Sequence, residues 1–254
     1  MSTVASHDGC AIAWTEVGSG DPVLLIHGFA STWRRNWQET GWMEALSRAG
    51  HQVIAYDQRG HGESEKRYDP EDYAPRRLVE DAMAVLDAAG VRRAVAMGYS
   101  MGARVALEVA LRHSTRLKAL VLAGMGIEFR DFGGPRYDRE IVAHALECDD
   151  TAGLPRGALF YRRFADQIRA DRRALAACWR RPIRELDATD LAAVTLPALF
   201  IVGDRDSVAG DPEPLAAAMR AAKVVRLAGK DHMNAVGATQ HREAVLAFLG
   251  ELGD

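Results

Sequence analysis

Cysteine, excess charge and long apolar runs are all scarce in this chain of 254 residues. The three cysteines, Cys10, Cys148 and Cys178, are odd in number and far apart, which argues against a disulfide framework and favours reduced thiols. A formal net charge of -3 excludes the strongly basic footprint of a nucleic-acid-binding protein. No apolar run approaches the ~18 residues that a membrane span requires, so we expect neither a nucleic acid nor a membrane as partner.

Targeting and cofactor signals are missing as well. The first residues, MSTVASHDGC, lack the basic start and apolar run of a secretory signal, which predicts a cytoplasmic protein. No His, Cys or carboxylate cluster has metal-site spacing, and GYSMGARV lacks the Lys-Ser/Thr of a phosphate loop, so we expect no metal and no other cofactor. The chain does contain 48% hydrophobic and 26% charged residues, the composition of a globular protein with a sizeable core. A monomer and a homodimer are both compatible with it.

Strand-like and helix-like patterns alternate along the chain. Asp8-Gly9 joins two short extended runs and predicts a hairpin. Apolar runs suited to strands covered on both faces follow, namely VLLIHG, HQVIAYD, RAVAMGY, LKALVLAG, LPALFIVGD and KVVRLAG. Between them lie stretches with helical spacing, which are 33–48, RRLVEDAMAVLDAAG, MGARVALEVALRH, EPLAAAMRAA and HREAVLAFLGEL. The pattern predicts an α/β fold with a mostly parallel eight-stranded sheet, helices on both faces and an antiparallel edge.

The alternation breaks once, between 127 and 195, where no strand-like run occurs. This segment contains recurring aromatic residues and twelve basic and twelve acidic side chains, so it offers no net charge to a ligand. We predict a helical insertion here, with the core formed by 1–126 and 196–254. Its place in the strand order favours a lid over a binding site, although composition alone also fits a helical subdomain with no such role.

Polar side chains follow the predicted strands at the edge where open parallel sheets bind ligands. Ser100 follows one strand, Asp204 and Asp206 another, and His232 the last. A serine hydroxyl is a weak nucleophile until an imidazole removes its proton, and the imidazole needs a carboxylate to hold its orientation and charge. The sequence therefore places the components of nucleophilic catalysis at one edge of the sheet.

The stretch Gly98-Tyr99-Ser100-Met101-Gly102 matches the pattern G-x-S-x-G. Its glycines permit a sharp strand-to-helix turn that leaves the serine oxygen exposed. An ordinary turn with Ser100 as a helix cap would explain this pentapeptide taken alone. At the start of the following helix, however, the Met101 N–H is free to help bind an oxyanion, and Phe29 is the natural source of a second N–H.

With its neighbours, the motif resembles the α/β-hydrolase family. The matching segments are HGF at 27–29, YDQRGHGES at 56–64, GYSMGA at 98–103, GDRD at 203–206 and DHM at 231–233. The resemblance covers nearly the whole chain apart from the insertion, and implies the α/β-hydrolase fold with a helical cap at 127–195. It assigns the site as nucleophile Ser100, acid Asp206, general base His232, and oxyanion-hole amides of Phe29 and Met101. Asp204 lies outside the family's G-x-x-D spacing and is expected to be a turn residue.

Other polar residues in these motifs are expected to be structural. Asp57 and Arg59 resemble the family's loop organisers, and His27 and His61 are expected to shape turns beside the site.

Serine at position 100 reduces the number of reactions that the site is expected to catalyse. The family's haloalkane dehalogenases and epoxide hydrolases resemble this chain but use Asp there. We therefore expect a carboxylic ester hydrolase for small to medium, mostly uncharged substrates, with a pocket lined by Trp33, Tyr99, Tyr137 and Phe164. A lactonase of the enol-lactone kind and a C–C bond hydrolase are alternatives with the same triad, although HGFASTWRRNW lacks the Gly- and Pro-containing loop usual in the latter. A ligand-binding protein that has lost turnover is the alternative from another class.

Overall fold

A computed structural model of the protein describes residues 1–129 and 139–252. The strands are β1 (Ser2–Ala5), β2 (Ala11–Val17), β3 (Asp21–Ile26), β4 (His51–Tyr56), β5 (Ala94–Tyr99), β6 (Leu117–Ala123), β7 (Ala198–Gly203) and β8 (Ala222–Leu227). They form one sheet in the order β1-β2-β4-β3-β5-β6-β7-β8. The pairs β1–β2 and β2–β4 are antiparallel and the remaining neighbours are parallel. This confirms the mostly parallel eight-stranded sheet and the hairpin at Asp8-Gly9.

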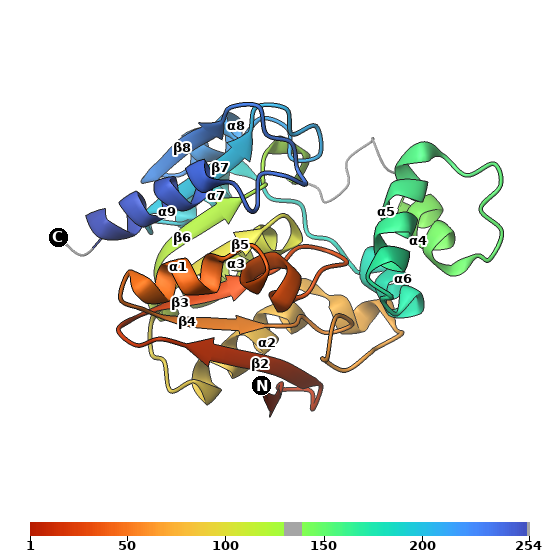
Figure 1. Cartoon of the computed structure of the whole chain (residues 1–254), viewed down its shortest axis with the longest axis horizontal. Helices are drawn as coiled ribbons and strands as arrows, with labels where there is room; N and C mark the ends of the chain where they lie inside the picture. Colours follow the sequence, from red (N-terminus) through yellow and green to blue (C-terminus); the bar gives the residue numbers. More distant parts are fainter. Residues whose placement is uncertain (130–138, 253–254) are drawn as a thin grey trace.

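Helices cover both faces of the sheet (Figure 1). The α-helices of the described residues are α1 (Trp42–Arg48), α2 (Pro75–Ala88), α3 (Met101–His113), α4 (Arg139–Glu147), α5 (Arg156–Gln167), α6 (Arg172–Arg180), α7 (Ala188–Ala193), α8 (Glu213–Ala218) and α9 (Thr239–Glu251). In β3, Leu24 and Ile26 pack with α2 and α3, whereas Val23 and Leu25 pack on the other face with α1 and α9. Because alternate side chains enter two different cores, the strand is apolar at consecutive positions.

The helix predicted over 33–48 consists of two shorter pieces. A π-helical turn covers Arg34–Gln38, in which the Glu39 N–H donates to the Arg34 carbonyl at 2.8 Å. Gly41, with a φ of 78°, separates it from α1. A π-helical turn is wider than an α-helical one, so it changes which side chains face the core.

Helices α4 to α7 occupy the segment between β6 and β7, and the described part of this segment contains no strand. Helices α4, α5 and α6 share a small apolar cluster of their own. Figure 1 shows this group beside the edge toward which the parallel strands point. The group also packs on Phe29 and Ala30, in the loop after β3. No helix among the described residues has both the length and the apolar character to cross a membrane.

His241 of α9 is buried against Trp42 of α1. The ring centroids are 4.7 Å apart, and His241 Nδ1 lies 3.1 Å from the Ala235 carbonyl oxygen. Burial disfavours the charged imidazole and lowers the pKa of His241 from 6.5 to about 4. As the pH falls below 6.5, the unfolded chain binds a proton at His241, whereas the folded protein does so only near pH 4. The free energy of unfolding therefore decreases as the pH is lowered between these two values.

We expect His241 alone to lower the free energy of unfolding by about 2 kcal/mol between pH 7 and pH 5. Urea unfolding at the two pH values measures this loss. The variant His241→Phe keeps an aromatic ring beside Trp42 but cannot titrate, so its loss should be smaller by about that amount. An equal loss in the variant and the wild type would contradict the assignment.

Candidate active site

Ser100 stands at the tip of the turn between β5 and α3 in a conformation that side chains rarely adopt, with φ 56° and ψ -119°. Two glycines make this turn possible. A Cβ on Gly98 would lie 2.2 Å from the carbonyl carbon of Gly102, and a Cβ on Gly102 would lie 2.0 Å from the carbonyl oxygen of Ile26. Only glycine fits at both positions, and the resulting strained turn holds the Ser100 hydroxyl out of the core.

Ser100, His232 and Asp206 form a continuous hydrogen-bonded chain. Ser100 Oγ lies 3.0 Å from His232 Nε2, and His232 Nδ1 lies 2.7 Å from Asp206 Oδ2. Because the ionised carboxylate can only accept, Nδ1 carries the proton in this pair and Nε2 is left to accept the proton of Ser100. The Asp206 side chain is fully buried, whereas His232 is 12% exposed. This arrangement can remove a proton from Ser100 as it attacks an electrophile.

The backbone around His232 is fixed by an aromatic neighbour. The Tyr99 hydroxyl donates a hydrogen bond of 2.6 Å to the His232 carbonyl oxygen, and the two rings are 5.5 Å apart. The Phe129 ring stacks at 6.4 Å on the imidazole. Tyr99 therefore positions the histidine loop as well as lining the pocket described below.

The two aspartates of the loop after β7 have different partners. Asp206 Oδ1 accepts hydrogen bonds from the amides of Val208 and Ala209, at 3.0 and 2.8 Å, which leaves Oδ2 for His232. Asp204 instead accepts the Gly229 amide at 2.8 Å and joins two loops. Asp206 thus contacts the imidazole and Asp204 does not do so among the described residues, while the role of Asp206 as the catalytic acid stays a prediction.

Two backbone amides border the space in front of Ser100. Met101 is the first residue of α3, so its N–H precedes the first hydrogen bond within the helix. Phe29 follows Gly28, whose backbone packs so closely that a Cβ there would lie 3.4 Å from the Cβ of Ser100. The Phe29 ring is held edge-on by Trp179 of α6, with centroids 4.9 Å apart. Met101 directly follows Ser100 and Phe29 directly follows Gly28, so both residues lie near the serine, and the role of their N–H groups in stabilising negative charge stays a prediction.

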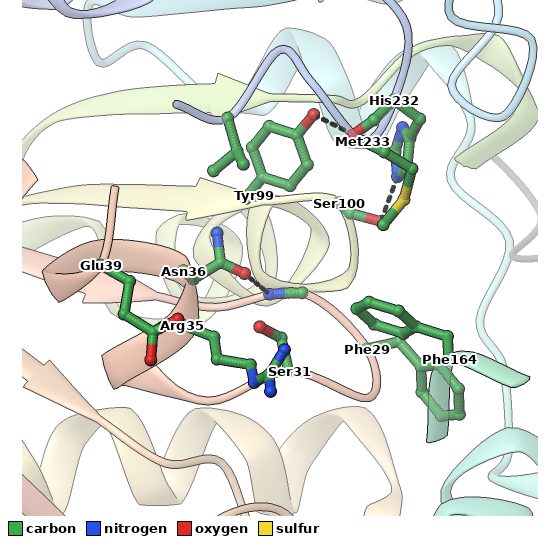
Figure 2. A pocket seen from close by; sticks show the side chains of 12 residues that line it. Phe29, Ser31, Arg35, Asn36, Glu39, Tyr99, Ser100, Phe164, His232 and Met233 are labelled. Atoms are coloured by element: carbon green, nitrogen blue, oxygen red, sulfur yellow. Dashed lines mark hydrogen bonds between the residues drawn. The ribbon is translucent and has the colours of Figure 1, made fainter. Parts of the chain in front are cut away.

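A pocket of about 210 Å³ opens in front of Ser100 (Figure 2). Its lining has an apolar side and a polar side. The described residues that line it are Gly28, Phe29, Ser31, Arg35, Asn36, Glu39, Tyr99, Ser100, Phe164, His232, Met233 and Val236. Among the residues predicted to line the pocket, Tyr99 and Phe164 do so.

The other two predicted pocket residues lie elsewhere. Trp33 is absent from the described lining and is 7% exposed, packed in the core with α1 and α9. Its backbone N–H donates to Asp57 Oδ1 at 2.9 Å. The structure thus corrects the assignment of Trp33, because its ring is buried in the core cluster with α1 and α9. Tyr137 lies outside the described residues.

The same π-helical turn supplies polar pocket residues that the sequence analysis missed. Arg35 and Asn36 lie in this turn, Glu39 directly follows it, and all three line the side opposite Phe164. Asn36 is 6% exposed; its Oδ1 accepts the Gly28 amide at 3.2 Å, while its buried Nδ2 has no partner among the described residues. A helical wheel would not have found this side, because it assumes α-helical spacing throughout 33–48.

The residues expected to organise neighbouring loops make buried structural contacts. Asp57 accepts the Trp33 amide and, through Oδ2, the Glu63 amide at 2.8 Å. His27 Nε2 accepts the Gln58 amide at 3.0 Å. His61 is also buried, and desolvation lowers its pKa from 6.5 to about 3, so it is neutral at physiological pH. None of these side chains touches the Ser100 hydroxyl within the described residues.

Arg59 is the centre of a buried charge network. Its Nε and Nη2 donate to the two carboxylate oxygens of Asp81, both at 2.7 Å, and Nη1 donates to Asp8 at 2.9 Å. We expect Arg59→Met to lower the free energy of unfolding by about 3–5 kcal/mol, because it leaves the buried Asp81 carboxylate unpaired. Urea denaturation measures the loss. The double variant Arg59→Met/Asp81→Leu should recover part of it, and equal losses in both would contradict the explanation.

Within residues 1–129 and 139–252, no group of three or more His, Cys, Asp or Glu side chains could hold a metal ion. Cys10, Cys148 and Cys178 are free thiols in the structure.

The sheet topology, the strained serine turn and the hydrogen-bonded chain through His232 are those of a hydrolase. Residues 21–171, more than half of the chain, match the family described as alpha/beta hydrolase fold. The protein belongs to this family.

Individual relatives cover the chain unequally. An epoxide hydrolase of Caballeronia sordidicola is 36% identical over 125 residues, which are 48% of this chain and 36% of that protein. Epoxide hydrolase B of Mycobacterium tuberculosis is 37% identical over 114 residues, 45% of this chain and 31% of that protein. The chain thus spans about a third of the length of these curated relatives. A solved hydrolase from Pseudomonas aeruginosa is 28% identical, with 98% of each chain covered and a TM-score of 0.82.

Proposed function

We propose that the protein is a serine hydrolase that cleaves carboxylic esters through an acyl-enzyme. The observation that carries this proposal is the chain of hydrogen bonds from Ser100 through His232 to Asp206, at 3.0 and 2.7 Å, at a pocket that both Ser100 and His232 line. Each group has the partner that acyl transfer to a serine requires.

In the acylation half, Ser100 Oγ attacks the ester carbonyl carbon and its proton passes to His232 Nε2. The carbonyl oxygen becomes an oxyanion that accepts hydrogen bonds from the amides of Phe29 and Met101. The positively charged imidazole is stabilised by Asp206. The C–O bond to the alcohol then breaks, and His232 returns the proton to the leaving oxygen.

Deacylation repeats these steps with water. His232 Nε2 takes a proton from a water molecule, and the resulting hydroxide attacks the acyl carbon through the same oxyanion. The bond to Ser100 Oγ breaks, Ser100 regains its proton from His232, and the carboxylic acid leaves. Water is the only co-reactant in this scheme.

Residues 127–195 are proposed to act as a cap. Phe164 of α5 lines the pocket, and Trp179 of α6 holds Phe29, so two helices of this segment touch groups next to Ser100. The pocket volume of about 210 Å³ suits a small to medium acyl group. Arg35 and Glu39 carry opposite charges on its polar side, which supports a mostly uncharged group next to the reacting carbonyl.

Epoxide opening, the activity named for the relatives above, is less compatible with Ser100. A carboxylate that opens an epoxide gives an alkyl ester, which water then cleaves. A serine oxygen that opened the same ring would give an ether, and the His232 base offers no route to hydrolyse it. We therefore propose ester cleavage rather than epoxide opening for this chain.

The test is steady-state hydrolysis of p-nitrophenyl acetate, butyrate and octanoate, combined with mass spectrometry of the rapidly quenched protein. We expect turnover and an acyl group on the peptide that contains Ser100. Turnover without an acyl-serine would contradict the mechanism, and diol formation from styrene oxide would favour epoxide chemistry.

Inactivity toward these esters would overturn the proposed ester hydrolysis and move attention to the alternatives. Enol lactones and vinylogous diketones would then be assayed with the same Ser100-directed detection of an acyl-enzyme. Thermal stabilisation by a ligand without any turnover would instead favour a binding protein on this fold.

A further inference from the structure

One face of α5 lines a groove of about 590 Å³ outside the pocket of Ser100. The residues on this face are spaced by three and four positions, which puts them on one side of a helix. They are Arg156, Leu159, Phe160, Arg163, Phe164 and Gln167, and Met233 faces them from the histidine loop. A different face of α5, with Ala158 and Ala165, packs in the cap cluster of α4, α5 and α6. Phe164 also packs against this cluster, whereas Arg156, Phe160 and Arg163 of the groove-lining stripe are exposed.

The groove is continuous with the pocket, because Phe164 and Met233 line both. Its floor is apolar and accessible: Phe160 is 42% exposed and Met233 is 44% exposed. A ligand that reacts at Ser100 can therefore extend an apolar chain past these side chains.

The groove also carries two positive charges. Arg156 and Arg163 are exposed, lie two turns apart and form no ion pair with another described residue. The adjacent Arg162 points away from the groove, since it pairs with Asp166 at 2.8 Å and donates to the Ala145 carbonyl at 3.0 Å. No carboxylate is among the described groove-lining residues.

The two carboxylates considered next, Asp231 and Glu39, lie near the groove or the pocket and interact with other groups. Asp231, next to His232, accepts the amides of Met233 and Asn234, both at 2.9 Å. On the far side of the pocket, Glu39 is offset by Arg35. The groove-lining stripe of α5, called the α5 stripe below, therefore gives this side of the groove a positive charge.

The groove lies on the side of His232, and this decides which part of an ester would enter it. His232 Nε2 must protonate the leaving oxygen, so the alcohol part of the substrate leaves past the histidine loop. Met233, the residue after His232, is part of the groove lining.

We propose that this groove binds the alcohol part of the substrate, as an apolar chain that ends in a carboxylate held by Arg156 and Arg163. The inference rests on the proposed ester hydrolysis at Ser100 and specifies its substrate class: an uncharged acyl group esterified to an alcohol with a remote anionic end.

The test compares two butyrate esters of the same length, O-butyryl ω-hydroxyoctanoate and the corresponding primary amide, by release of butyrate. We expect kcat/KM to favour the carboxylate by about threefold to tenfold at low salt, with the preference shrinking as salt is added. In Arg156→Gln/Arg163→Gln the ratio should approach one. O-butyryl glycolate holds its carboxylate next to the ester and should show no such preference over its amide.

Arg220→Gln is the matched control, because it removes the same charge from an exposed site before β8, at the amino end of the strand and away from the groove. It should keep the preference for the carboxylate. The proposed subsite would be overturned if the double variant and the wild type showed an equal preference, or if the wild type showed none. In either case, Ser100-dependent cleavage of the amide-bearing ester would still support the proposed function.

If neither ester is hydrolysed, the proposed function fails and binding decides the subsite alone. Isothermal titration of Ser100→Ala with O-butyryl ω-hydroxyoctanoate should then show binding that weakens about threefold to tenfold when both arginines are replaced. Unchanged or absent binding would overturn the inference.

Discussion

Ser100→Ala is expected to lower kcat/KM for p-nitrophenyl butyrate by about four to six orders of magnitude. The variant loses the only side-chain oxygen that lies 3.0 Å from His232 Nε2 among the described residues, so no acyl-enzyme can form. The Phe29 and Met101 amides remain, and the residual rate reflects binding and oxyanion stabilisation alone. Steady-state kinetics on both proteins measures the difference. A variant that keeps a tenth of the wild-type rate would rule out Ser100 as the nucleophile.

Stability should respond very differently to the same substitution. Removing the hydroxyl deletes one hydrogen bond at a partly exposed position, so the free energy of unfolding should change by no more than about 1 kcal/mol. Alanine also keeps the Cβ that makes φ 56° and ψ -119° unfavourable. Ser100→Gly removes both the hydroxyl and this strain, and should be more stable than Ser100→Ala by about 1 kcal/mol.

The pair of variants separates chemistry from folding. Both should be inactive, yet Ser100→Gly should unfold at a higher urea concentration than Ser100→Ala. A large loss of stability in Ser100→Ala would mean that its inactivity says little about catalysis. Equal stability of the two variants would contradict the inference that the turn stores strain.

The candidate catalytic residues could be predicted because the register of a parallel sheet makes their convergence nearly unavoidable. Tyr99 pairs with Ala123, and Gly203 pairs with Leu227, so β5 to β8 end at the same edge. Ser100 follows directly, and the loops after Gly203 and Leu227 carry Asp206 and His232. Spacing along the chain and the apolar strand runs contain this information.

The pocket wall depends on local geometry that apolar spacing does not encode. The segment after β3 was predicted as one helix, whereas it forms a π-helical turn, a break at Gly41 and then α1. In this segment Trp33 is buried in the core, whereas Arg35 and Asn36 line the pocket. A π-helical turn rotates the following side chains relative to α-helical spacing, and no composition signal marks it.

The α5 stripe shows a second way in which periodicity is ambiguous. Spacing by three and four positions usually predicts the face that packs in the core. In α5 the small residues Ala158 and Ala165 are buried in the cluster and Phe164 packs against it, while the stripe with Arg163 and Phe164 lines the groove and pocket. Only the placement of α4 and α6 decides between the two faces, and that is a tertiary property.

Asp206→Asn is expected to lower kcat for the same ester by about four orders of magnitude. The reason lies in the partners of the two oxygens. The Val208 and Ala209 amides donate to Oδ1, so they will hold the carbonyl oxygen of an asparagine in that position. The amide NH2 must then face His232 Nδ1, where Oδ2 now accepts. A donor at that place favours the tautomer with the proton on Nε2, which cannot accept the proton of Ser100.

Asp204→Asn is the matched control in the same loop. Its Oδ1 accepts only the Gly229 amide among the described residues, and an asparagine oxygen can make the same hydrogen bond, so activity should fall less than about threefold. Equal losses in the two variants would show that the loop as a whole, not the Oδ2 of Asp206, supports the imidazole. A loss of activity in Asp206→Asn alone, with the free energy of unfolding unchanged, would tie the rate to the tautomer of His232. The reason is that the two substitutions remove the same charge from neighbouring positions and differ only in the group that faces His232 Nδ1.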